Sequence, residues 1–167
     1  RIIYTVEMSG RGGASAPWTQ TIDLEADIAP VFDIRVYSNG KEGVDLKFGD
    51  VSYKTGPKTS DVEIYVETNL QRPYQIIQKV IGPMANEKGD KVPPENFTMR
   101  VLSCGEEEAP RSMLRDITPV KQGDTVVFAS GPRGKSTCLK VQYGLKMELD
   151  SRSGNYGARI GYSLALN

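Results

Sequence analysis

The sequence predicts an all-β fold, an antiparallel sandwich or barrel built around one main domain. Apolar and polar residues alternate with a period of two along most of the chain, which is typical of strands with one buried face. Clusters of Gly, Pro, Asn, Asp and Ser separate these runs at short intervals, as turns between strands do. No window of a dozen residues holds a convincing helical stripe. Many short strands without helices indicate the all-β class.

The first thirty residues contain two alternating runs joined by a small, glycine-rich stretch. RIIYTVEM, residues 1–8, places one apolar set on one side: Ile2, Tyr4, Val6 and Met8. SGRGGASAP follows, and its composition is typical of a flexible linker rather than a hairpin loop. TQTIDLEADIAP, residues 19–30, alternates more strictly and places a second apolar set on one side of the strand: Ile22, Leu24, Ala26 and Ile28.

We therefore expect residues 1–29 to be an N-terminal extension and residues 30–167 to be the sandwich domain. An alternating strand on a flexible leader can bury its apolar face only if a sheet accepts it. That sheet belongs either to its own domain or to a neighbouring copy, and the pattern alone leaves both possibilities open.

The domain itself is expected to contain eight strands. Six of them are VFDIRVYS, VDLKFGDVSY, SDVEIYVET, YQIIQKVI, NFTMRVLS and GDTVVFAS. LKVQYGLKMEL, residues 139–149, and NYGARIGYSLALN, residues 155–167, complete the set. The last run places one apolar set on a single face: Tyr156, Ala158, Ile160, Tyr162, Leu164 and Leu166. Each run is expected to be a half-buried strand.

Composition excludes several classes of function. The 167 residues carry 21 basic and 21 acidic side chains, so there is no basic excess for nucleic acid. The apolar runs are only a few residues long, far too short to span a membrane. The chain has no histidine, which rules out Ser-His-Asp and Cys-His nucleophilic sites within it. We expect no catalytic residues, no metal site and no cofactor, and therefore no enzyme.

The stretch GPRGKST, which begins at Gly131, resembles a phosphate-binding loop only superficially. A P-loop needs a glycine five positions before Gly134, where Ala129 stands, and it must open a helix. The residues that follow alternate with a period of two. The stretch is expected to be a hairpin connection between two antiparallel strands.

The two cysteines, Cys104 and Cys138, lie 34 positions apart without a CxxC partner. This favours one disulfide in an exported domain. Two separately buried thiols in a cytosolic protein are the alternative.

A wider pattern runs through TIDLEADIAPVFDIRV, SDVEIYVETN, YQIIQKV and SGNYGARIGYSLAL. An alternating N-terminal segment ends in a proline before the next apolar strand, and a Gly-x-Tyr strand closes the chain. Over roughly residues 20–167, the sequence resembles the pilins of chaperone–usher fimbriae, and it is most similar to the alpha-type (class 5) colonisation-factor and cable pilins. The leader and the two cysteines depart from that family. They leave open a more distant donor-strand filament family.

The resemblance implies an incomplete immunoglobulin-like sandwich that a strand from the next subunit completes. The chain would then be a structural subunit of an extracellular filament for adhesion or biofilm, exported through the periplasm with a chaperone and an usher. Its partners would be head-to-tail copies of itself. The implied donor residues are Ile22, Leu24, Ala26 and Ile28, with Ile2, Tyr4, Val6 and Met8 as the second candidate set. The implied acceptor groove contains Tyr156, Ile160, Tyr162 and Leu164.

A secreted β-sandwich binding module, for example for carbohydrate, is the competing hypothesis. It requires a closed domain with a surface aromatic platform, and the eight tyrosines do not cluster in the sequence.

Overall fold

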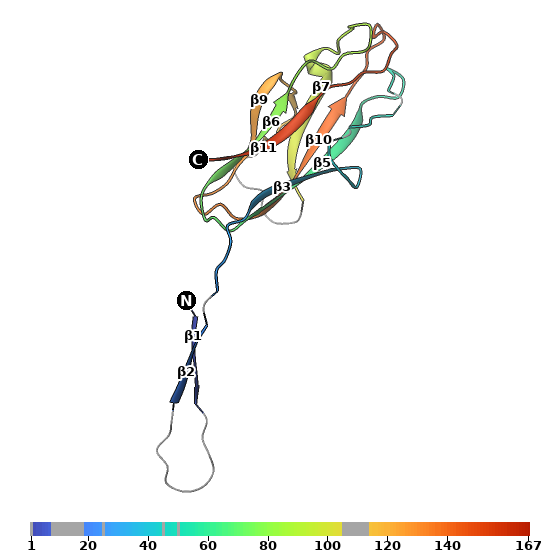
Figure 1. The fold of residues 1–167 in the computed structure, drawn as a ribbon. Helices are drawn as coiled ribbons and strands as arrows, with labels where there is room; N and C mark the ends of the chain where they lie inside the picture. Colours follow the sequence, from blue (N-terminus) through green and yellow to red (C-terminus); the bar gives the residue numbers. More distant parts are fainter. Residues whose placement is uncertain (1, 8–18, 25, 45, 50, 105–113) are drawn as a thin grey trace, which may run out of the picture. The chain divides into compact units, whose positions relative to one another are not determined.

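The structure is a computed structural model that describes residues 2–7, 19–24, 26–44, 46–49, 51–104 and 114–167. The chain divides into two compact units, Arg1–Pro30 and Val31–Asn167. Every strand pair is antiparallel, and the described residues form strands, turns and one short 3-10 turn, η1 (Pro94–Asn96) (Figure 1). The predicted all-β antiparallel sandwich is confirmed.

The N-terminal unit contains two strands, β1 (Ile2–Glu7) and β2 (Thr19–Leu24), which pair with each other. Ile2 lies opposite Leu24 and Tyr4 lies opposite Ile22. The alternation predicted both strands, but it did not predict their pairing. The SGRGGASAP linker lies outside the described residues.

The domain of residues 31–167 has one large and one small sheet. The large sheet has the order β4-β3-β5-β10-β7-β8. Its strands are β3 (Phe32–Ser38), β4 (Lys41–Glu42), β5 (Lys58–Thr68), β7 (Phe97–Ser103), β8 (Thr118–Pro119) and β10 (Thr137–Leu145). The small sheet has the order β11-β6-β9. Its strands are β6 (Tyr74–Val80), β9 (Gly123–Ala129) and β11 (Ile160–Leu166).

The core lies between the two sheets and is built by the period-two alternation. On β10, for example, Leu139, Val141, Tyr143 and Leu145 are buried while the residues between them are partly exposed. The inward residues of β5, β6 and β7 are buried in the same way. Alternate burial of this kind removes apolar surface from water at about 25 cal/mol per Å².

Three strand predictions are corrected by the structure. The described residues of VDLKFGDVSY form no strand, although Val44, Leu46 and Phe48 pack against the core. Gly43 and Gly49 adopt positive φ there, so the backbone turns away from an extended ladder. The run over residues 139–149 leaves the sheet after Leu145, and the final strand begins only at Ile160. Alternation in these places reflects packing without a neighbouring strand.

The GPRGKST stretch connects the two sheets, because β9 belongs to the small sheet and β10 to the large one. The expected hairpin is therefore wrong, while the expected absence of a following helix is confirmed by β10. The loop is held against the β5–β6 connection. The Tyr74 hydroxyl donates to the Lys135 carbonyl at 2.8 Å, and the Thr68 N–H donates to Ser136 Oγ at 3.0 Å.

The two cysteines form the predicted disulfide, Cys104–Cys138. In the ladder between β7 and β10, Ser103 lies opposite Leu139, so the disulfide closes the next step of the same register. A disulfide is compatible with an exported protein. Among the described residues, the structure has no helix of the length and apolarity that a membrane span requires.

Candidate functional site

The two sheets present four edges, and three of them carry features that discourage further strand pairing. β4 is only two residues long and fully charged, and the part of β3 that it leaves unpaired carries two charged residues. β8 is equally short and includes Pro119, which has no N–H to offer. β9 carries Asp124 and shifts register opposite Ile76 and Ile77 of β6. Short length, charge, proline and a bulge are the usual protective devices of an edge strand.

The fourth edge, β11, has none of these devices. Its seven residues, IGYSLAL, include no charge and no proline. It pairs with β6 over its whole length, from Ile160 opposite Val80 to Leu166 opposite Tyr74, and no described strand pairs with its other side. A long, uncharged, regular edge of this kind is a template for another strand.

Two hydrogen bonds at the ends of β11 define which backbone groups its open side presents. The Ile81 N–H donates to the Arg159 carbonyl, and the Asn167 N–H donates to the Pro73 carbonyl, both at 3.0 Å. Hydrogen-bonded and non-hydrogen-bonded residue pairs alternate along an antiparallel ladder. Odd-numbered residues of β11 therefore bond to β6. The backbone groups on the open side belong to Ile160, Tyr162, Leu164 and Leu166.

The first three of these residues also face the core. Ile160 is buried, whereas Tyr162 and Leu164 are partly buried and pack against the core. β3, at the neighbouring side of the large sheet, contacts β11. Its inward residues Phe32 and Ile34 are likewise only partly buried, while Ile64 on the adjacent strand β5 is fully buried. The core is thus less covered along β11 and β3 than at its centre. We call this region the β11 edge.

A hydrogen-bond chain fixes β11 to both sheets. The Tyr143 hydroxyl on β10 donates to Gln78 Oε1 on β6 at 2.7 Å and also contacts the Tyr162 hydroxyl. Because a tyrosine has a single O–H proton, Tyr162 must donate to Tyr143. Burial raises the pKa of both tyrosines above the ordinary value. The pair is neutral at ordinary pH and holds β11 in place without charge.

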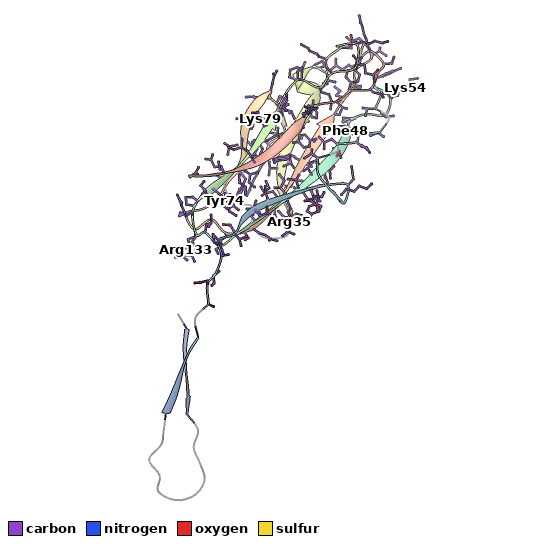
Figure 2. The ribbon with its side chains drawn as sticks, in the orientation of Figure 1. Arg35, Phe48, Lys54, Tyr74, Lys79 and Arg133 are labelled. Carbon is purple, nitrogen blue, oxygen red and sulfur yellow. A yellow bond between two sulfur atoms is a disulfide. The ribbon has the colours of Figure 1, made fainter. Side chains whose placement is uncertain are left out.

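The structure brings three of the four predicted acceptor residues together. Ile160, Tyr162 and Leu164 share the inward face of β11. Tyr156 lies before the strand, donates its hydroxyl to the Arg152 carbonyl at 2.8 Å, and lines a separate depression of about 710 Å³. Phe48, which is labelled in Figure 2, lines the same depression.

The predicted donor residues fall into two parts. Ile22 and Leu24 belong to β2, whereas Ala26 and Ile28 follow the strand and are exposed, Ile28 to 85%. In the second candidate set, Ile2, Tyr4 and Val6 belong to β1. Met8 lies outside the described residues.

Sequence reasoning missed the part that β3 plays in the site. Phe32, Ile34 and Val36 alternate in VFDIRVYS like any core-facing set. Only the pairing of β11 with β6 shows that the small sheet stops short of them. The signal available in the sequence was the absence of charge and proline in IGYSLAL.

Comparison with known proteins leaves the family open. No family model matches the chain, and no curated protein matches it. Among solved structures, a family 123 glycoside hydrolase from Clostridium perfringens is similar over 65% of this chain and 18% of that chain, with 12% sequence identity and a TM-score of 0.40. A likeness of this size carries no argument about function. The described residues contain no group of His, Cys, Asp and Glu arranged to hold a metal ion.

Proposed function

We propose that the chain is a structural subunit of an extracellular filament that polymerises head to tail by donor-strand complementation, serving surface adhesion or biofilm. The single observation that carries the proposal is the β11 edge, the one sheet edge of the described domain without a protective device. A strand from a neighbouring subunit adds to its backbone and covers the apolar residues beneath.

The gain from such an addition is large enough to hold a filament. Burying three aliphatic side chains contributes on the order of 5 to 9 kcal/mol before the costs of ordering the donor strand. The same addition covers Phe32 and Ile34, which the domain leaves partly exposed. A head-to-tail contact does not close on itself, so copies continue into an open filament.

The N-terminal unit supplies a strand that can be donated to a neighbouring subunit. β1 and β2 pair only with each other in the described sheets, and an isolated two-stranded ribbon is marginally stable in water. β2 is therefore expected to gain stability when it leaves β1 and pairs with a strand of a larger sheet. Until then, a periplasmic chaperone would cover the β11 edge, since an exposed edge strand is a template for unintended strand pairing.

Light scattering of the full chain beside two single variants tests the proposal. Leu24→Asp adds a charge to the alternating apolar set, whereas Thr21→Asp adds the same charge to the opposite face of β2. We expect polymers from the wild type and from Thr21→Asp, and monomers from Leu24→Asp, because an unpaired charge cannot enter an apolar site.

A version lacking residues 1–28 should stay folded and form no head-to-tail polymers, because it has no donor strand to give to a neighbour. The filament proposal would be refuted if the wild-type chain stayed monomeric at every concentration while circular dichroism showed a folded domain.

A second candidate function, carbohydrate binding, has one observation in its favour. Tyr37 and Tyr65 lie edge to face on the outer side of the large sheet, with ring centroids 5.7 Å apart, and they line a shallow depression of about 330 Å³. The polar groups around them are already engaged, since Arg35 pairs with Glu67 at 2.7 Å. Binding to a glycan array that Tyr65→Ala abolishes would favour this function.

A further inference from the structure

Resting on the proposed function, we infer that residues 22–28 of a second copy add antiparallel to β11 in one register. In that register Leu24 lies opposite Tyr162 on β11, and Asp27 lies opposite Arg159, which immediately precedes the strand. Direction, backbone phase, side-chain volume and charge each bear on this pairing.

The direction follows from where the domain begins and ends. The Asn69 N–H donates to the Val31 carbonyl, and the Asn167 N–H donates to the Pro73 carbonyl. Since Asn69 and Pro73 belong to the same β5–β6 connection, both ends of the domain lie at one end of the sandwich. Within the domain, Figure 2 shows Tyr74 and Arg133 toward this end and Lys54 at the other.

An antiparallel donor brings its residue 28 to the start of β11, at the opposite end of the acceptor. The donor's own domain then continues beyond that end, and the copies follow one another head to tail. A parallel donor would bring the Val31 of the donor to the same end of the sandwich as the Val31 of the acceptor, so that successive domains would crowd each other. The antiparallel direction separates successive domains along an open filament.

The phase of the ladder follows from the open backbone groups of β11. These belong to its even-numbered residues, the first three of which also face the core. Directly opposite residues of an antiparallel pair lie on the same face, so the donor's even-numbered residues must lie opposite them. This places the apolar donors Ile22, Leu24, Ala26 and Ile28 on the covered side and Asp27 on the outer side.

Volume excludes one of the two neighbouring registers that this phase allows. With Leu24 opposite Tyr162, the small Ala26 faces Ile160 and the large Ile28 faces Ala158. A shift of two residues along β11 toward its start would set Ala26 against Ala158 and leave a gap between two small side chains. Packing of large against small fills the layer without voids.

Charge excludes the opposite shift, which would set Asp27 against Gly161 and leave it without a charged partner. Asp27 and Arg159 are both exposed and lie on the outer face in the proposed register. Neither side chain forms an ion pair with another described residue. Opposite charges directly across an antiparallel pair are favourable, while like charges are not.

Cysteine cross-linking of full-length chains tests the register. Asp27 and Arg159 form a non-hydrogen-bonded pair in the proposed ladder, where Cα atoms approach to about 4.5 Å, a separation that suits a disulfide. The test variant is Asp27→Cys with Arg159→Cys. The matched controls combine Asp27→Cys with Gly157→Cys or Gly161→Cys, because an added Cβ meets nothing within 4 Å at either glycine.

We expect a ladder of covalent oligomers on non-reducing gels, about ten times stronger for the 27/159 pair than for either control. Peptide mapping of the linked product excludes exchange with the native disulfide. A stronger ladder from a control, polymers without any link, or a link within one chain would overturn the register. Wild-type chains that never polymerise would instead refute the proposed function.

Discussion

The hydroxyl of Tyr143 on β10 donates a 2.7 Å hydrogen bond to Oε1 of Gln78 on β6, and so joins the two sheets through the centre of the core. Both side chains are fully buried. Tyr162 extends this chain to β11, while Nε2 of Gln78 is left without a hydrogen-bond partner. A polar connection therefore crosses the apolar core and runs to the strand that carries the open edge.

Replacing Tyr143 by Phe should destabilise the domain by about 1 to 3 kcal/mol, because it leaves Gln78 Oε1 and the Tyr162 hydroxyl without their partner. Urea unfolding followed by circular dichroism measures the loss. Tyr53→Phe, at a half-exposed position, is the control and should change the free energy of unfolding by less than about 0.5 kcal/mol.

A double-mutant cycle separates the hydrogen bond from simple packing. Gln78→Met combined with Tyr143→Phe removes both polar groups, so the double variant should lose less stability than the two single variants together. Strict additivity would show that the bond between Tyr143 and Gln78 contributes nothing of its own.

Alkaline pH should weaken the domain through its buried tyrosines. Desolvation raises the pKa of Tyr143 and Tyr162, and raises the pKa of Tyr74 to about 12. An unfolded tyrosine ionises near pH 10, so above that pH the unfolded chain binds fewer protons than the folded one. The stabilisation is complete below about pH 10 and is lost as pH rises through the folded pKa values.

The free energy of unfolding should therefore fall between about pH 10 and 12, by up to about 1.4 kcal/mol per pH unit for each buried tyrosine. Urea titrations at successive pH values measure the slope, and absorbance at 295 nm follows the phenolate. Tyr162→Phe should make the slope shallower. A slope unchanged in that variant would show that Tyr162 ionises freely in the folded domain.

Gly134 should tolerate no side chain, although its loop looks like a solvent-exposed turn in the sequence. It adopts a φ of +47°, and an added Cβ would lie 1.8 Å from the Arg72 carbonyl oxygen. Gly134→Ala should cost at least about 2 kcal/mol in the free energy of unfolding, since the loop and the β5–β6 connection must separate. Gly131→Ala, where nothing lies within 4 Å, is the matched control. Equal thermal stability of the two variants would contradict the close approach.

The longer strands of this domain could be predicted, because each contains enough alternating residues to reveal a period of two. β5, β6, β7 and β9 lie almost where their runs indicated. β4 and β8 could not be predicted, since two residues carry no period. The run at Val44, Leu46 and Phe48 misled because packing against a core also produces alternation. Whether such a run also pairs with a neighbouring strand depends on where the rest of the chain places its other strands.

The candidate site was only half predictable for the same reason. Ile160, Tyr162 and Leu164 follow from the period of the last strand, but pairing is a property of two strands and not of one. The pairing of Ile2 with Leu24 likewise could not be inferred from either alternating run alone. The inter-sheet path of GPRGKST required knowing that β9 pairs with β6 and not with β10.

Removing the disulfide should destabilise the domain without changing its strand order. Cys104–Cys138 closes a loop of 34 positions, and a cross-link of that span contributes about 2 to 4 kcal/mol, mainly by restricting the unfolded chain. The double variant Cys104→Ser with Cys138→Ser should therefore unfold at lower urea with nearly the same far-ultraviolet spectrum. Because β7 and β10 already pair from Ser103 to Phe97, the ladder itself does not need the link.

A reducing agent should lower wild-type stability to that of the double variant and leave the variant unchanged. Loss of the β spectrum on reduction would show that the disulfide holds the fold itself.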